Sequence, residues 1–249
     1  NGGNATNVQI TNLTNQDGDP LAGGENTIRF NINVTGVSSG VETVTITPVD
    51  NSSIFNSFGI GVSGSSSVTQ QLNDYFPPVA SFDPADGETI WPSDNLVIDF
   101  GEEIKLAGNT DATNENIDAL LNFIYTDVQQ VIDFDATINA SKDIITVNPE
   151  NDLTEESEVQ LSIGANSFYD DFGNVLEPAS ATFLVSDATL PEISAASIAS
   201  NNAYVSIIFS EGIYTNEGGN GGLNTSDFDI TFNQNSGNAT PAAISSLTN

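Results

Sequence analysis

Apolar and polar residues alternate along most of this chain with the period of two that is typical of β-strands. In residues 27–34 the apolar positions Ile28, Phe30, Ile32 and Val34 all fall on one face. Runs rich in β-branched and aromatic residues, separated by clusters of Gly, Asn and Asp, predict further strands over residues 41–49, 96–100, 144–147, 159–163, 181–185, 204–209 and 228–232. Many short strands with turn-rich spacers predict an all-β fold made of β-sandwich domains.

One segment departs from this pattern and predicts a helix. Residues 114–125 (NENIDALLNFIY) follow Thr113, which can cap a helix N-terminus. The apolar residues of this segment that share one helical face are Ile117, Leu120, Leu121 and Ile124. We expect this helix to be an exception in an otherwise β-rich chain.

Composition narrows the chemistry. The chain has 249 residues, enough for two domains, and its 38 % hydrophobic content allows cores to form. Its 34 acidic residues outnumber three basic ones, for a net charge of −31, which argues against nucleic-acid partners and favours hard cations. Without Cys or His, the usual zinc sites and Ser-His-Asp catalysis are excluded. No apolar run approaches the roughly 20 residues that span a bilayer, so we expect no membrane insertion.

Two short segments share the spacing Asp-x-x-x-Pro. They are Asp74–Pro78 (DYFPP) and Asp187–Pro191 (DATLP), and each lies between a predicted last strand and a new extended segment. Proline fixes φ and donates no ladder hydrogen bond, so it suits a short, semi-rigid linker between domains. The segment between the two linkers, about residues 76–187, has the size of one Ig-like domain.

The chain ends much as it begins. Residues 3–15 (GNATNVQITNLTN) and 237–249 (GNATPAAISSLTN) share eight of thirteen residues, including the apolar positions Ile10 and Leu13. The shift of 234 positions predicts a tandem repeat, with this chain a window on an array of that period. The organisation predicted from it is the C-terminal half of one Ig-like domain, a complete domain and the N-terminal half of the next: residues 1–75, 76–187 and 188–249.

Several motifs lie in the central segment. Residues 77–104 begin with a Pro-rich link and end with a strand that runs into Phe100-Gly101-Glu102, and residues 145–176 contain the loop Asp170–Asn174 (DDFGN). These motifs resemble bacterial Ig-like repeat domains of S-layer proteins and giant cell-surface adhesins, which have Phe-Ser-Glu at the strand end and an Asp-x-x-Gly-Asn loop. The resemblance implies tandem Ig-like sandwiches in a surface stalk, adhesin or filament.

The flanking segments resemble a second bacterial Ig-like repeat of giant surface proteins. Residues 204–232 are similar to its first half and keep Phe209-Ser210-Glu211 intact. Residues 40–59 are similar to its second half, where the loop has become Asn56–Ile60 (NSFGI). The sequence therefore predicts that the two ends belong to one type of domain and the centre to another.

Calcium is the one ligand that this composition favours, because hard cations take carboxylate and carbonyl oxygens. In the family that the chain resembles, the Glu after the strand and the Asp-rich loop lie at the same end of the sandwich. The predicted ligands are Glu102, Asp170 and Asp171 in the central domain, Asp187 and Glu211 at the second junction, and Asp74 at the first, with Glu103, Asp83 and Asp86 as further candidates. The alternative is that these acids only form turns and solvated surface.

The sequence predicts a structural role rather than an enzyme, because no group of residues indicates a catalytic cleft. We expect a segment of a secreted bacterial surface adhesin whose partners are neighbouring repeats or identical chains, with surface glycans bound through other regions. One alternative is a short subunit of a non-covalent filament in which residues 188–249 of one chain are completed by residues 1–75 of the next by strand addition. The other is a carbohydrate-binding adhesin module.

Overall fold

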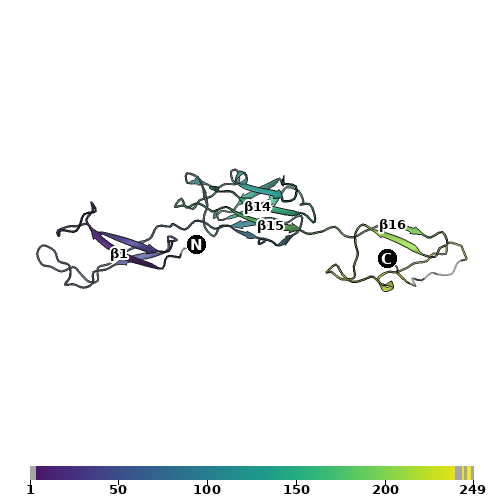
Figure 1. Cartoon of the computed structure of the whole chain (residues 1–249), viewed down its shortest axis with the longest axis horizontal. Helices are drawn as coiled ribbons and strands as arrows, with labels where there is room; N and C mark the ends of the chain where they lie inside the picture. The colour runs from purple at the N-terminus through teal and green to yellow at the C-terminus, as the bar shows by residue number, and fades with distance from the viewer. Residues whose placement is uncertain (1–3, 239–242, 244–245, 248–249) are drawn as a thin grey trace. The chain divides into compact units, whose positions relative to one another are not determined.

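The computed structural model describes residues 4–238, 243, 246 and 247. This part is almost entirely β, with seventeen strands and two short 3₁₀ helices, so the all-β prediction is confirmed. The chain divides into two compact units, Asn1–Asp187 and Ala188–Asn249 (Figure 1), and each is described by itself. Most of residues 237–249, on which the predicted repeat depends, lie outside the described residues, so the repeat stays a prediction.

Two sheets of the first unit enclose one hydrophobic core. The five-stranded sheet has the order β11 (Gln130–Val131), β10 (Leu121–Tyr125), β14 (Glu158–Ile163), β15 (Ala179–Val185) and β6 (Thr89–Ile90). The four-stranded sheet has the order β12 (Phe134–Ile138), β13 (Ile144–Pro149), β7 (Leu96–Asp99) and β5 (Ser81–Asp83). Neighbours are antiparallel except β15 and β6, which are parallel. A small hairpin of β8 (Lys105–Leu106) and β9 (Thr110–Asp111) follows β7.

The core forms because alternate residues of both sheets point inward. In β14 the residues Val159, Leu161 and Ile163 are buried, and those between them are only half-buried. Every buried hydrophobic residue in the described part of the chain lies between Ile90 and Val185. Each large side chain that is fully buried contributes roughly 1.5–3 kcal/mol, so this core makes residues 80–185 the most stable part of the fold.

The predicted helix over residues 114–125 is wrong. Its middle forms a single 3₁₀ turn, η1 (Asp118–Leu120), and its end forms β10. Leu121 and Phe123 are buried and Asn122 is exposed, which is the period of a strand. All five residues of β10 pair with β14, and these ladder and core contacts outweigh a weak helical preference.

The N-terminal part of the first unit consists of two antiparallel strand pairs. β1 (Asn7–Thr14) pairs with β2 (Arg29–Thr35), and β3 (Thr43–Ile46) pairs with β4 (Val68–Gln71). Strands predicted over residues 27–34 and 41–49 are thereby confirmed, with β3 shorter than expected. None of these four strands contributes to the core described above. The predicted boundary between residues 75 and 76 stays a prediction, because the first unit includes both sides of it.

The second unit has one sheet of two strands in its described residues. β16 (Ile193–Ile198) pairs with β17 (Val205–Phe209), and a 3₁₀ helix, η2 (Thr225–Asp227), follows. The strand predicted over residues 228–232 is wrong, because that segment has no ladder partner among the described residues and a strand forms only through such hydrogen bonds. No helix in the described residues has the length and apolar character needed to cross a membrane.

Candidate metal site

Three carboxylates meet in the first unit. Asp74 follows β4, Glu102 follows β7, and Asp170 lies in the loop between β14 and β15. One carboxylate oxygen from each lies within 4.8 Å of the others. The side chains are sheltered, because Asp74 is only 5 % exposed, Asp170 only 3 %, and Glu102 is half-buried. The cluster therefore joins the junction that precedes the central sandwich to two loops of that sandwich.

Hydrogen bonds within the loop Asp170–Asn174 fix the position of the Asp170 carboxylate. Oδ1 of Asp170 accepts hydrogen bonds from the backbone N–H groups of Phe172 at 2.9 Å and Asn174 at 2.8 Å. Oδ2 accepts a bond from Nδ2 of Asn174 at 2.7 Å. Gly173 allows the tight turn because its φ of +86° is in the left-handed region. Both carboxylate oxygens are thus positioned before any ligand arrives.

Asn174 also fixes the first junction. Its Nδ2 donates to the backbone carbonyl oxygen of Asp74 at 3.2 Å. The Asp74 side chain in turn accepts a hydrogen bond from the backbone N–H of Phe76 at 2.8 Å. The linker and the loop are therefore connected by a neutral amide, which adds no charge to the cluster.

Burial and neighbouring like charges disfavour the ionised form of Glu102 in the cluster. Burial, followed by the negative charges of Asp170, Asp74 and Asp171, raises the pKa of Glu102 from 4.5 to about 7. Oxygen-only donors with up to three negative charges match the preference of hard divalent cations. Asp74, Glu102 and Asp170 can hold a metal ion of this class.

The structure brings together three of the six predicted ligands. Asp171 is outside the cluster and lies 3.4 Å from Nζ of Lys105. Asp187 is the exposed last residue of the first unit, and Glu211 follows β17 in the second unit, so neither is part of the cluster. The candidate site combines Asp74 of the first junction with two residues of the central domain. The sequence had predicted these ligands in two separate groups.

The three further candidates have other surroundings. Glu103 accepts a hydrogen bond from Lys105 Nζ at 2.6 Å. The carboxylate of Asp86 accepts the backbone N–H of Thr182 at 2.8 Å, and Asp83 ends strand β5. None of these three residues belongs to the cluster.

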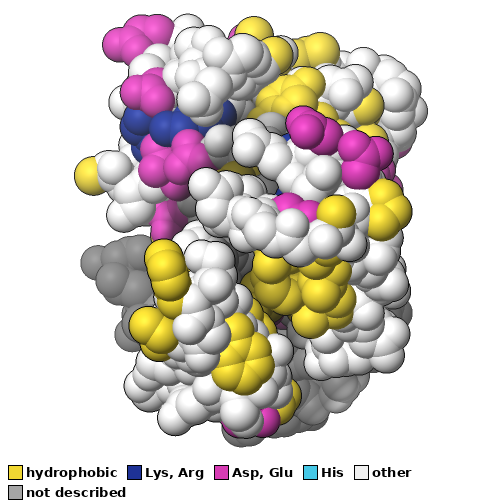
Figure 2. Space-filling model, turned by 90° about the vertical axis from the view of Figure 1, so that its left-hand side faces the viewer, with side chains coloured by type: hydrophobic (Ala, Val, Ile, Leu, Met, Phe, Trp, Pro, Cys, Tyr) yellow, Lys and Arg dark blue, Asp and Glu magenta, His cyan; other side chains and the backbone are white. Residues whose placement is uncertain are grey.

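Two of the three basic residues, Lys105 and Lys142, lie in one ion-pair network with Glu103, Asp111 and Asp171. Lys105 Nζ contacts Glu103 at 2.6 Å and Asp111 at 3.1 Å, and Lys142 Nζ contacts Asp111 at 2.8 Å. Hydrogen bonds to Glu103 and Asp111 raise the pKa of Lys105, and those from the two lysines lower the pKa of Asp111. Figure 2 displays Lys and Arg side chains bordered by acidic ones on one face of the molecule. These ion pairs do not include Asp74, Glu102 or Asp170.

In the part of the chain that the structure describes, the Asp170–Asn174 loop conformation also occurs at Asn15–Asp19 and Asn56–Ile60. In each loop the side-chain oxygen of the first residue accepts the backbone N–H groups of the third and fifth residues, at 2.8–3.0 Å. The fourth residue is a glycine with positive φ whose N–H donates to the first residue's carbonyl oxygen. Asn and Asp are therefore equivalent for the loop backbone, and only the charge differs.

The sequence missed the bridging role of Asn174. The Asp-x-x-Gly-Asn pattern predicted a loop, and the loop is present. The last residue of the pattern varies among the three loops, being Asp19, Ile60 or Asn174. The Asn side chain at the last position of the loop is the signal that could have indicated this contact, because its amide can donate to a second segment such as the one that contains Asp74.

Comparisons with known proteins give little further information. No family model matches this chain. No curated protein matches it either. The similar solved structures include CopC from Methylosinus trichosporium OB3b, at 10 % identity and a TM-score of 0.32 over 46 % of this chain and 98 % of that one.

Two structures of a surface-layer protein are also similar to part of the chain. They are domains 1–6 of the surface layer protein SbsC and the N-terminal part of the bacterial S-layer protein SbsC, each at 13 % identity with a TM-score of 0.33. The matches cover 54 % and 53 % of this chain but only 18 % and 31 % of the SbsC structures. At this level of similarity no function transfers to the chain.

Proposed function

We propose that this chain is a structural segment of an elongated bacterial cell-surface protein, built of Ig-like domains whose first junction is stiffened by a calcium ion. The observation that carries the proposal is the cluster of Asp74, Glu102 and Asp170. Asp74 belongs to the linker, and the other two residues belong to the central sandwich. A cation held by all three ties the linker to the domain and restricts bending, which is what a stalk requires.

The strand order supports an Ig-like assignment of the central domain. Constant-type Ig domains place strands one, two, five and four in one sheet and strands three, six and seven in the other. Counting the principal strands here, β5, β7, β13 and β12 follow the first order, and β10, β14 and β15 follow the second. β6 and β11 are additional short strands at the two edges of the second sheet.

Calcium suits this site better than magnesium on chemical grounds. Calcium accepts six to eight oxygen ligands in flexible geometry, and backbone carbonyls and water can complete the set. Magnesium demands near-ideal octahedral geometry and gives up water reluctantly. The three carboxylate oxygens lie within 4.8 Å of one another, which is compatible with Ca–O distances of about 2.3–2.6 Å.

Charge and composition support an extracellular structural role. A net charge of −31 keeps neighbouring fibres apart by repulsion. The chain contains no Cys, Met or His, so it depends on neither disulfides nor oxidation-sensitive side chains. We also propose that the chain catalyses no reaction and that any adhesive ligand is bound by other parts of the protein.

The test measures the stiffness of the junction. Because the chain has no Cys, Gln71→Cys and Gln130→Cys provide two unique spin-label positions, one on β4 and one on β11. We expect calcium to narrow the distribution of label-to-label distances and a chelator to broaden it. The same double-labelled chain with Asp74→Asn should keep the broad distribution, and Asp152→Asn, at an exposed position outside the cluster, should respond like the parent. Equal distributions with calcium and with chelator would refute the proposal.

A further inference from the structure

Residues 4–75 and residues 188–238 correspond to complementary halves of a domain like the central one. We propose that residues 4–75 of one copy and residues 188–238 of a second copy form a single two-sheet domain, in which β17 pairs with β2 and residues 228–232 pair with β3. This inference deepens the proposed function, since it states how segments of the stalk join. It does not depend on the calcium site.

The N-terminal part matches the second half of the central domain. In that half, the hairpin β12–β13 is followed by the pair β14–β15, and the Asp170–Asn174 loop lies between the last two strands. In residues 4–75, the pair β1–β2 is followed by the pair β3–β4, and the Asn56–Ile60 loop lies between the last two strands. The two loops make the same hydrogen bonds.

The C-terminal unit matches the first half of the central domain. β16 and β17 form an antiparallel pair as β5 and β7 do. β7 runs into Phe100-Gly101-Glu102, and β17 ends at Phe209, followed by Ser210-Glu211. In chain order, residues 228–232 follow β17 after a loop-rich segment, as β10 follows β7 in the central domain. The strand pairs of residues 4–75 and those of residues 188–238 therefore correspond to different halves of the central domain.

Both halves expose the faces that a core would bury. The paired residues Val8 and Val34, Ile10 and Ile32, and Leu13 and Phe30 form one apolar face of the β1–β2 sheet. Ile10 is 58 % exposed, whereas the equivalent inward residues of the central sheets are buried. Strand pairs of this size are marginally stable alone in water.

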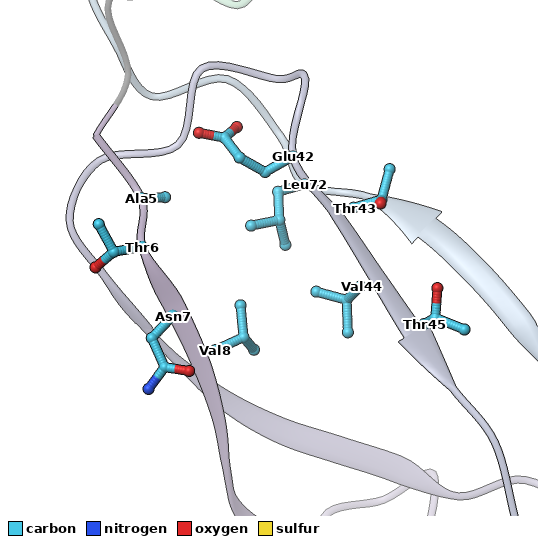
Figure 3. A pocket seen from close by; sticks show the side chains of 9 residues that line it. All are labelled: Ala5, Thr6, Asn7, Val8, Glu42, Thr43, Val44, Thr45 and Leu72. Carbon is cyan, nitrogen blue, oxygen red and sulfur yellow. The ribbon is translucent and has the colours of Figure 1, made fainter.

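A cavity marks the space between the two N-terminal strand pairs. It has a volume of about 400 Å³ and is lined by residues of both pairs, including Val8, Val44 and Leu72 (Figure 3). The Val8, Val44 and Leu72 side chains point toward one another across this space, as residues of facing sheets do in a sandwich. The two sheets are arranged around a core that their own side chains do not fill.

The C-terminal unit offers side chains of the right kind. In β17, Val205 is 56 % exposed and Ile207 is 42 % exposed, and both lie on the same face of the strand. Phe228, Ile230 and Phe232 alternate with polar residues, although no ladder forms there within the described chain. A partner strand from a second copy explains why a segment with strand periodicity remains unpaired.

The pairing follows from the central domain. There β13 lies between β12 and β7, and β14 lies between β10 and β15. By equivalence, the edge of β2 that does not face β1 receives β17, and the edge of β3 that does not face β4 receives residues 228–232. Residues 4–75 and residues 188–238 both carry net negative charge, and residues 188–249 contain no Lys or Arg. Attraction between opposite charges therefore does not drive the association, and burial of apolar side chains does. Added salt should strengthen the association, because it screens the repulsion between the two segments.

The test uses two variants of the full chain in sedimentation velocity. Val44→Asp disrupts the N-terminal face, and Ile207→Asp disrupts β17. We expect the parent chain to form oligomers that grow with concentration and each variant alone to be a monomer. An equimolar mixture should give one species of twice the monomer mass, because each variant keeps the half that the other has lost.

Controls separate this result from misfolding and from general aggregation. Val128→Asp, at a 63 % exposed position of the central domain, should associate like the parent. The fluorescence of Trp91, the single Trp of the chain, should give the same unfolding transition of the central domain in all variants. A parent chain that stays monomeric, or a mixture without the two-chain species, would overturn the inference and leave the calcium test of the first junction unaffected.

Discussion

Asn174 and Asp74 are hydrogen-bonded although they lie 100 residues apart in the sequence. Nδ2 of Asn174 donates to the Asp74 backbone carbonyl oxygen at 3.2 Å and to Oδ2 of Asp170 at 2.7 Å. One amide therefore holds the linker and the acidic loop together. This group is neutral, so it brings the carboxylates close together without adding charge to the cluster.

Removing this amide should weaken both the fold and the site. We expect Asn174→Ala to lower the free energy of unfolding by about 1–2 kcal/mol, because two part-buried hydrogen bonds are lost. Calcium affinity should fall as well, since Asp74 is no longer held near Asp170. Urea unfolding and calorimetric titration measure the two effects. Asn122→Ala, at an exposed position in β10, is the matched control and should change neither quantity.

The raised pKa of Glu102 predicts an unusual dependence of stability on pH. The folded state keeps a proton on Glu102 up to about pH 7, whereas the unfolded chain loses it near pH 4.5. Metal-free protein should therefore lose stability as pH rises from about 4.5 to 7, by on the order of 1–2 kcal/mol after allowance for solvent screening of this half-buried group.

Glu102→Gln isolates that effect from the other acids. Glu25, Glu42 and Asp50 have lowered pKa values and give the opposite trend with pH, so the parent alone is not diagnostic. In chelator, the variant should gain stability over the parent at pH 8 and show little difference at pH 4. Equal differences at the two pH values would contradict the assigned pKa.

Calcium should stabilise the parent chain through the cluster. At a free concentration 100 times the dissociation constant, the expected gain is about 2.7 kcal/mol in the free energy of unfolding. Asp170→Asn should abolish this gain while the loop keeps its backbone hydrogen bonds, because Asn56 accepts the same backbone hydrogen bonds in its own loop. Thermal unfolding with calcium and with chelator measures the gain, and Asp152→Asn should retain it. A full calcium effect in Asp170→Asn would exclude this residue as a ligand.

Gly173 should be difficult to replace for a backbone reason alone. Its φ is +86°, and a Cβ added there would meet no atom within 4 Å. Gly173→Ala should therefore cost roughly 1–2 kcal/mol through left-handed strain rather than through a clash. Gly164→Ala is the control, because Gly164 is not in the left-handed region and its added Cβ would make only an ordinary contact with Ser167 at 3.7 Å. Similar losses in the two variants would argue against the strain.

Local pattern predicted most of the strands and failed where pairing decides the outcome. Residues 159–163 alternate clearly, residues 96–100 are rich in apolar and β-branched residues, and both segments form strands. Residues 114–125 have apolar positions that fit a helix and a strand equally well over a few residues, and the edge of β14 selected the strand. Residues 228–232 alternate as a strand does, but a strand also needs a partner, and alternation carries no information about one.

The candidate site divides in a similar way. The residue types and the Asp-x-x-Gly loop pointed to oxygen ligands near Asp170, and family topology added Glu102. The choice of Asp74 rather than Asp171 as the third carboxylate depends on how the linker passes the loop and on the salt bridge that takes Asp171 toward Lys105. Neither contact could be predicted from the sequence, because the residues involved lie far apart in the chain and form no motif of fixed spacing.

Residue types and local spacing were enough to predict the all-β class, the acidic and Cys-free chemistry and the loops that glycine makes possible, because each of these depends on side chains close together along the chain. The tertiary structure was needed to show that Asp74, Glu102 and Asp170 meet and that the hydrophobic core lies between Ile90 and Val185. Only it left the apolar faces of both ends exposed. The physical reason is that burial and charge repulsion depend on which distant segments come together, and local preferences do not specify that.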